Sequence, residues 1–347
     1  MRTYKLDFEV GYGCNFRCKY CFERMGAPGY ADKAMTPEVV DRGILYAQHV
    51  LEELPEDSRL AICFFGGEPL LYPDIITRVV EGLQTEAVFN IVTNGSLIQQ
   101  NRDLLLRLKS LVGERLRMRV SYDYALQEEY RQQGSYQTVR DNIRWLYDND
   151  FPVSTITTIS EDVLPCFDMV FSDYLKLHRK CMKLPMKVNV VRGNTDGAFN
   201  EVGTKAALFR VVKWLEKHDA LELVHYNAGC GYRGERYPGC VFGRVYAGID
   251  INGDLYPGYS VIHDDETIRK AMYLGNVNEE FSVLDEKREG LIESLNHDIS
   301  GECSSCVTPC QLLPWSTIKT GVQEFNAMPE ENHCRIHKLV KKYLPHE

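Results

Sequence analysis

Short apolar runs and longer stretches of helical periodicity alternate along the first 200 residues. Each run is mostly apolar or β-branched and is bounded by polar or turn residues, a pattern typical of strands. The predicted strands cover Lys5–Val10, Leu60–Phe65, Val88–Val92, Leu116–Val120, Val153–Ile159 and Lys187–Val191.

Helical patterns lie between these runs. The clearest begins at Thr36-Pro37, where an N-cap residue precedes a proline at the first helical position. Residues 102–112 and 138–147 have similar patterns. Strands that alternate with helices predict an α/β fold with a parallel sheet and right-handed crossovers. Six units are too few for an eight-unit barrel, so we expect a partial (β/α)6 TIM barrel. Its active site should lie at the carboxyl ends of the strands.

The alternation stops after Asn194. One helix is predicted at about 205–218, and a region rich in Gly, Tyr and Cys follows it. We therefore expect a barrel domain over residues 1–200, a linking helix over 201–229 and a cysteine-rich domain over 230–347. The last has weak secondary-structure signals, which is typical of a domain that depends on metal for its fold.

Composition narrows the class of protein. The 347 residues are 44% hydrophobic and 26% charged, which suits a globular protein with a real core. The net charge of -9 and the lack of a basic cluster disfavour a nucleic-acid partner. No signal peptide or apolar run of about 20 residues is present, so we expect a cytoplasmic protein without a membrane partner.

Twelve cysteines in a cytoplasmic chain of this size indicate metal or cluster ligation rather than disulfides. Cys14, Cys18 and Cys21 have the spacing C-x3-C-x2-C directly after the first predicted strand. Three thiolates on one loop can hold three irons of a cubane and leave the fourth open to a small molecule. A structural zinc site would need a fourth ligand close by, which this loop lacks. Cys63 lies in an apolar run and is predicted to be a core thiol.

This motif, with the aromatic Tyr20 before Cys21, resembles that of the radical S-adenosylmethionine (SAM) superfamily. The resemblance implies a [4Fe–4S] cluster whose open iron is chelated by the methionyl group of SAM. Electron transfer from the cluster would then cleave SAM to a 5′-deoxyadenosyl radical that abstracts hydrogen from a substrate. An electron donor such as flavodoxin or ferredoxin is implied as a partner.

Two further motifs follow predicted strands. Gly66-Gly67-Glu68-Pro69 resembles the GGEP motif of the superfamily, in which Glu68 or nearby carbonyls would accept from the SAM ammonium. Taken by itself, this motif is also explained by a tight turn. Thr93-Asn94-Gly95 resembles the family's TNG segment, which lies close to the cofactor.

Ser121-Tyr122-Asp123 resembles the family's S-x-D pattern, although Tyr124 replaces the usual glycine and implies a differently shaped loop. Arg131 matches an arginine that pairs with the SAM carboxylate in relatives; a solvated charge at a helix end is the alternative. The resemblance thus implies cofactor contacts from Tyr20, Gly66, Gly67, Glu68, Thr93, Asn94, Ser121, Asp123 and Arg131.

Cysteines near the C-terminus, together with the segment Gly253–Pro257, resemble the SPASM or twitch extension, which binds auxiliary [4Fe–4S] clusters. The match departs from the family pattern at Gly258, where relatives have a cysteine, and in its C-x2-C-x3-C spacing. Cys303, Cys306, Cys310 and Cys334 make one complete auxiliary site, and a zinc ribbon is the alternative. Cys230 and Cys240 would form half a site or join a shuffled ligand set.

SPASM-type relatives mostly modify peptides by crosslinking, epimerisation or backbone excision, so the resemblance implies a ribosomally made precursor peptide as substrate. The chain begins at the first predicted strand, so we expect no N-terminal peptide-recognition domain and a separate leader-peptide-binding protein as partner. Two alternatives stay open: a small-molecule dehydrogenase of the aminoglycoside type, and oxidation of a protein side chain as in sulfatase maturases.

Overall fold

Ten strands of the described chain form one sheet with the order β10-β9-β8-β1-β2-β3-β4-β5-β6-β7. The computed structural model describes residues 2–21, 33–84, 87–159, 163, 166–181, 184–190, 201–226, 246–263 and 266–296. The sheet therefore joins segments from both ends of the sequence, with β1 near its middle.

Six parallel strands confirm the predicted α/β core. The bounds of five lie within two residues of those predicted, and the first strand begins three residues earlier than predicted. The six strands are β1 (Arg2–Glu9), β2 (Ser58–Phe65), β3 (Val88–Thr93), β4 (Leu116–Ser121), β5 (Val153–Ile159) and β6 (Met186–Val190). Adjacent strands pair in order, so that Asp7 lies beside Cys63, Cys63 beside Asn90, and Asn90 beside Arg117. All six carboxyl ends consequently meet at one edge.

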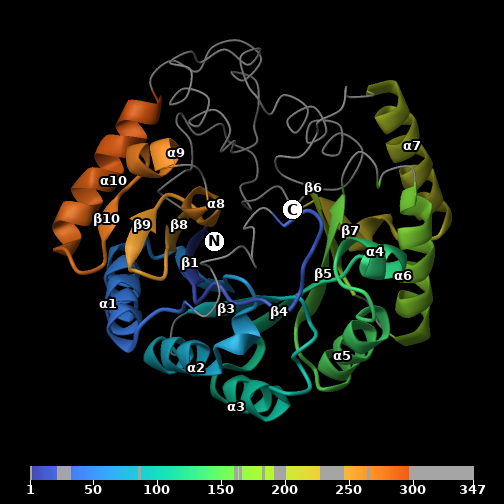
Figure 1. The fold of residues 1–347 in the computed structure, drawn as a ribbon, viewed down its shortest axis with the longest axis horizontal. Helices are drawn as coiled ribbons and strands as arrows, with labels where there is room; N and C mark the ends of the chain where they lie inside the picture. Colours follow the sequence, from blue (N-terminus) through green and yellow to red (C-terminus); the bar gives the residue numbers. More distant parts are fainter. Residues whose placement is uncertain are drawn as a thin grey trace.

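Helices connect these strands and form an arc outside the sheet (Figure 1). The first, α1, is capped by Thr36, whose side chain accepts from Val39 N at 3.4 Å, and Pro37 is its first residue. No helix in the described ranges is long and apolar enough to cross a membrane. The long helices of the arc are α1 (Pro37–Glu53), α2 (Pro73–Gly82), α3 (Arg102–Val112), α5 (Tyr136–Asp148), α6 (Phe167–Cys181) and α7 (Glu201–Lys217).

Alternation along the strands separates an apolar outer face from a polar inner face. Phe8, Phe64 and Phe89 are fully buried, and their ring centroids lie 6.4 and 6.5 Å apart along the series. A Cβ on Gly43 of α1 would lie 2.8 Å from Phe8, which places Phe8 on the helix side. Successive side chains point to opposite faces, so Asp7 and Glu9 point into the barrel.

The segment after residue 224 adds four strands that the sequence pattern did not predict. β7 (Val224–Tyr226) lies parallel to β6, and β8 (Tyr246–Ile249) lies parallel to β1. β9 (Asp254–Tyr256) and β10 (Gly275–Asn276) continue the sheet in antiparallel fashion. Three helices accompany them, α8 (Tyr259–Ile262), α9 (Glu266–Ala271) and α10 (Phe281–Asn296). The proposed domain boundaries stay a prediction.

Candidate functional site

Four loops meet at the carboxyl edge of the parallel strands. They follow β1, β2, β3 and β4 and contain the three N-terminal cysteines, the GGEP motif, the Thr-Asn-Gly segment and Asp123. This is the edge where α/β sheets hold their ligands. Hydrogen bonds connect each loop to a neighbour.

The loop after β1 carries the three cysteines, and all three are half-buried. Phe16 is 4% exposed and anchors the loop in the core. Cys21 N donates to Cys18 O at 3.2 Å, and Phe16 N donates to Cys14 Sγ at 3.4 Å. Burial is the main reason that the pKa of Cys14 is raised to about 12, and the nearby Glu68 and the two other thiols raise it further. The hydrogen bond from the Phe16 N–H lowers this pKa, but by less. The free Cys14 thiol is therefore protonated at neutral pH, and ligation of iron must displace that proton.

These thiols fit a cubane better than a single ion. No three His, Cys, Asp or Glu side chains in the described ranges converge closely enough to chelate one ion. A [4Fe–4S] cluster spreads its cysteine ligands over different irons, so its thiols need not converge on one point. The half-buried loop at the ligand-binding edge has the donor set and position that such a cluster requires.

The Gly-Gly turn after β2 is packed against the cysteine loop. Gly67 N donates to Gly11 O at 2.9 Å, and Glu68 N donates to Gly13 O at 2.8 Å. A Cβ on Gly66 would lie 2.3 Å from Gly11 O, and one on Gly67 would lie 2.1 Å from Gly13 O. Gly66 also has φ +127, which favours glycine. Both glycines are therefore required by the approach of the cysteine loop itself.

Glu68 joins the loops after β2 and β3. Its carboxylate is fully buried and accepts from Thr93 Oγ1 at 2.6 Å, Asn94 N at 2.7 Å and Leu70 N at 3.1 Å. Burial raises its pKa to about 7, against the opposing effect of these three donors. The three bonds leave little room on this carboxylate for another donor, so its clearest role is to position the two loops.

Asn15, between the first two cysteines, belongs to the same network, and the motif analysis gave it no role. Its Oδ1 accepts from Asn94 Nδ2 at 2.8 Å, and its Nδ2 donates to Ser96 Oγ at 2.8 Å. Tyr72 was also missed: its hydroxyl accepts from Gly13 N at 2.7 Å. The Cys-Asn dipeptide was the signal available for Asn15, whereas no local pattern marks Tyr72.

A second network unites Tyr20, Asp123 and Arg131. Arg131 Nε donates to Asp123 Oδ2 at 2.9 Å and Nη2 donates to Oδ1 at 3.3 Å, while the Tyr20 hydroxyl donates to the same carboxylate. Burial would lower the pKa of Arg131, but Asp123, Tyr20 and Cys18 raise it above its ordinary value. The guanidinium therefore stays charged beside the cysteine loop. Ser121, at the end of β4, is half-buried and joins neither network in the described chain.

Tyr124 has a glycine-like backbone, with φ 53. A positive φ favours glycine, so this residue has a backbone conformation that tyrosine rarely adopts. A loop shaped differently from that of relatives stays a prediction. The side chain is fully buried, and its hydroxyl lies 2.7 Å from Thr155 Oγ1.

A buried acid pair lies behind the cysteine loop. Glu9, at the end of β1, and Asp250, just after β8, are both fully buried. His263 Nε2 lies 2.6 Å from Glu9 Oε1. Burial and Asp250 raise the pKa of Glu9 well above its ordinary value, whereas Arg269 lowers it. These contacts connect the end of β1 to the segment after β8, and no sequence motif indicated them.

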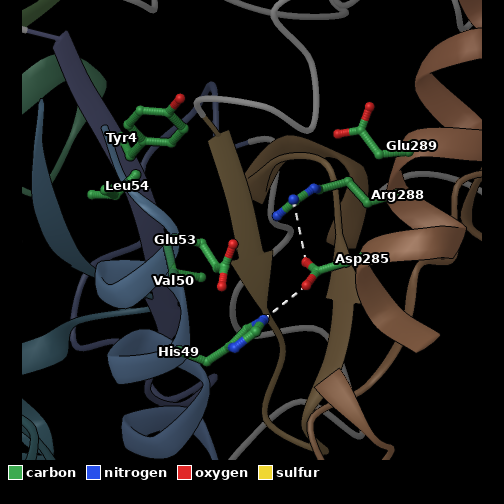
Figure 2. Close-up of a pocket in the computed structure, with 8 residues that line it drawn as sticks. All are labelled: Tyr4, His49, Val50, Glu53, Leu54, Asp285, Arg288 and Glu289. Carbon is green, nitrogen blue, oxygen red and sulfur yellow. Dashed lines mark hydrogen bonds and ion pairs between the residues drawn. The ribbon is translucent and has the colours of Figure 1, made fainter. Parts of the chain in front are cut away.

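A pocket of about 320 Å³ lies elsewhere, between α1 and α10 (Figure 2). His49 Nε2 lies 2.8 Å from Asp285 Oδ2, and Arg288 Nη2 lies 3.2 Å from Asp285 Oδ1. Tyr4, near the start of β1, also lines the pocket, which places it at the edge of the sheet away from the cysteine loop. It contains none of the predicted site residues.

The predicted auxiliary-cluster cysteines lie outside the described residues. This applies to Cys230, Cys240, Cys303, Cys306, Cys310 and Cys334. The Gly253–Tyr256 part of the associated motif is described: Gly253 has φ +87 in a turn where Asp250 Oδ1 accepts from Asn252 N at 2.8 Å and from Asp254 N at 3.0 Å. An auxiliary cluster therefore stays a prediction.

Comparison with known proteins finds a family match over part of the chain. The family model "Radical SAM superfamily" matches residues 8–163. The radical SAM cyclopropyl synthase TigE of Paramaledivibacter caminithermalis is 35% identical over 108 residues, 27% of this chain and 22% of TigE. The AdoMet-dependent heme synthase of Methanosarcina barkeri is 25% identical over 172 residues, 47% of this chain and 46% of the synthase. The chain thus matches less than half the length of these curated relatives.

Solved structures share the fold along most of the chain. The structure of anSMEcpe with AdoMet and the Cp18Cys peptide has a TM-score of 0.71 at 16% identity and covers 98% of this chain and 96% of its own. Streptococcus suis SuiB bound to its precursor peptide SuiA has a TM-score of 0.66 at 13% identity and covers 92% and 74%. The segment that matches the radical SAM model, residues 8–163, thus contains the three-cysteine loop at the ligand-binding edge of the sheet.

Proposed function

We propose that this chain reductively cleaves SAM and abstracts hydrogen from a ribosomally made precursor peptide, which it modifies by crosslinking, epimerisation or backbone excision. The observation that carries the first part is the half-buried three-cysteine loop, hydrogen-bonded to the Gly-Gly turn at the carboxyl edge of the sheet. The peptide part is supported by the fold shared with anSMEcpe and SuiB, whose structures hold peptides.

When bound, the cluster and SAM together supply a 5′-deoxyadenosyl radical. The chain's own groups hold and orient them. Cys14, Cys18 and Cys21 would hold the cluster as thiolates. The Gly-Gly turn holds the cysteine loop through backbone hydrogen bonds, and the Glu68 carboxylate holds the Thr93-Asn94 segment by accepting from Thr93 Oγ1 and Asn94 N.

Arg131 is the proposed partner of the SAM carboxylate. A guanidinium has five N–H donors, and the two bonds to Asp123 leave donors for a second carboxylate. Asp123 fixes the orientation of the guanidinium before the cofactor arrives, which lowers the entropic cost of binding. Tyr20 contributes through the same carboxylate.

Replacement of Cys14, Cys18 and Cys21 together by Ala tests the cluster assignment. We expect the variant to form no 5′-deoxyadenosine from SAM under anaerobic, reducing conditions, as measured by mass spectrometry. Cys166→Ala is the matched control, because that thiol is exposed and far along the chain from the loop. Formation of 5′-deoxyadenosine by the triple variant would contradict the proposal.

The peptide substrate needs its own experiment. Short peptides encoded beside the gene are incubated with the anaerobic enzyme, with and without a neighbouring leader-peptide-binding protein, and examined for a change in mass. The second candidate is a small-molecule reaction, favoured by 29% identity over 97 residues to the nucleotide dehydratase of Selenomonas ruminantium. Consumption of a nucleotide with no change in the mass of any peptide would favour a small-molecule reaction.

A further inference from the structure

The inside of the barrel carries a cluster of charged side chains that the proposed cofactor contacts do not use. Register places their residues on the face opposite Phe8 and its outward-facing neighbours, because paired residues on adjacent strands share a face. On the six core strands, the inward positions with charge are Lys5, Asp7 and Glu9 on β1, Arg59 on β2, Arg117 and Arg119 on β4, and Lys187 on β6.

Five of these seven groups are cations, although the whole chain has a net charge of -9. Arg59 Nε donates to Thr3 Oγ1 at 2.9 Å. Lys5 Nζ lies 3.8 Å from Asp7 Oδ1. Arg117 and Lys187 also have interaction partners. The raised pKa of Glu9 reduces the negative charge on this face further. A cation excess in a partly dehydrated interior favours the entry of an anion.

Arg119 differs from the other inward cations. Its side chain is half-buried, and it makes no hydrogen bond or ion pair with any residue of the described chain. It faces the same space as Cys63, because its charge and those of Lys5 and Asp7 act on that fully buried thiol. A guanidinium in this position presents a planar fork of donors to a ligand, and carboxylates match that fork.

Asn90 is an independent sign of a ligand in the same space. Its side chain is 2% exposed, and its Oδ1 has no hydrogen-bond partner, while Nδ2 donates to Ile62 O at 3.5 Å. Asn90 pairs with Arg117, so Arg119 is its diagonal neighbour on the inner face, at roughly 7–8 Å between strands. A buried acceptor without a donor is costly and is expected to find one in a ligand.

We propose that Arg119 binds a carboxylate of the substrate inside the barrel, while Asn90 Oδ1 accepts from an N–H of the same molecule. A peptide residue with an acidic side chain supplies both groups, so the substrate class is a peptide with Asp or Glu at or beside the modified residue. This inference rests on the proposed peptide-modifying function and adds the chemical character of the substrate.

Binding of two matched probes tests the inference without turnover. N-acetyl-glutamate N-methylamide and N-acetyl-glutamine N-methylamide are titrated calorimetrically into the anaerobic, cluster-loaded protein with SAM present. We expect the glutamate probe to bind about ten- to a hundredfold more tightly, as a charge-assisted hydrogen bond provides. Arg119→Gln should abolish this preference, and Arg119→Lys should retain part of it because the charge stays without the fork.

Arg144→Gln is the matched control, because Arg144 is exposed on α5 and pairs with Asp148 at 3.5 Å. It should keep the full preference. Equal binding of the two probes to the unmodified protein, or a preference that survives Arg119→Gln, would overturn the inference. If Arg119→Gln weakened SAM binding but left the preference for the glutamate probe unchanged, Arg119 would be a cofactor contact, and the inference would be overturned as well. Failure of SAM cleavage would instead count against the proposed function, since these probes report binding alone.

Discussion

At the scale of single residues, Tyr124 shows how an unusual side chain is accommodated beside the site. A non-glycine residue with positive φ is strained by about 1 kcal/mol or more. Its buried ring lies 4.6 Å from that of Tyr122 and 5.6 Å from that of Tyr174, and its hydroxyl contacts Thr155. Aromatic packing and this hydrogen bond offset the strain of the positive φ.

The Arg131–Asp123 pair gives a prediction that separates stability from cofactor binding. Arg131→Ala leaves the buried Asp123 carboxylate without its cation, which should cost about 3–5 kcal/mol of unfolding free energy. The double variant Asp123→Asn/Arg131→Met removes both charges but keeps an acceptor for Thr158 N, which donates to Asp123 at 3.0 Å. It should recover most of the stability.

SAM affinity should not recover in the double variant. Loss of the guanidinium is expected to weaken SAM binding by about ten- to a hundredfold in both variants. Anaerobic titration calorimetry measures the affinity, and denaturant unfolding measures the stability. Normal affinity in the double variant would show that Arg131 has a structural role only.

At the scale of elements, the Gly-Gly turn after β2 packs against the cysteine loop, so we expect cluster binding to depend on this turn. A methyl group at Gly67 would meet the backbone oxygen of Gly13, which cannot move without displacing the cysteine loop. We expect Gly67→Ala to cost about 1–3 kcal/mol through overpacking and to lose most of the bound iron. Iron and sulfide analysis of the anaerobic protein provides the measurement.

Gly290→Ala is the control for this substitution. Gly290 lies in α10 with open space around its Cα, so a methyl group there should leave the iron content unchanged and favour the helix slightly. Equal iron content in the two variants would contradict the proposed role of the turn.

Element positions were predictable where the pattern is strong and local. The six core strands are apolar runs with turn residues at both ends, and the bounds of each lie within three residues of those predicted. β8, β9 and β10 have only four, three and two residues, respectively, and exist because β1 offers a partner edge. Such short segments carry too little local signal to be separated from loops.

Site residues were likewise predictable where they belong to a local motif and not where their contacts are long-range. Local motifs indicated the cysteines, the Gly-Gly-Glu turn and Asp123, which the structure places at one edge of the sheet; their roles stay predictions. Tyr72, Glu9 and His263 were missed because their roles arise from contacts between distant segments. The bond between Gly13 N and Tyr72 OH, for example, joins residues 59 positions apart in the chain.

At the scale of the whole molecule, Glu9 links the sheet to the segment after β8 and makes stability depend on pH. Its pKa in the folded protein is raised by burial and by Asp250. The unfolded chain therefore ionises Glu9 first, near pH 4.5, and stability falls as pH rises from there through the folded pKa. Glu9→Gln removes this pH-dependent loss of stability. The thermal midpoint of the variant, measured relative to that of the unmodified protein, should therefore increase as pH rises.

Thermal unfolding of the anaerobic, iron-loaded protein between pH 5 and pH 8 provides the test. Glu266→Gln is the control, because Glu266 is fully exposed and its pKa is lowered by Lys270. It should show no such gain. A constant difference between Glu9→Gln and the unmodified protein would contradict the prediction.

The parallel pairing of β1 with β8 has a consequence for synthesis on the ribosome. β1 leaves the ribosome well before its partner strand, because Lys5 pairs with Tyr246 and Phe8 with Ile249. One edge of β1 therefore stays open while some two hundred and forty residues are added. An open strand edge is a site for intermolecular pairing, and long-range pairing slows folding. Chaperone binding to the nascent chain and late loading of iron are the expected cellular requirements of this topology.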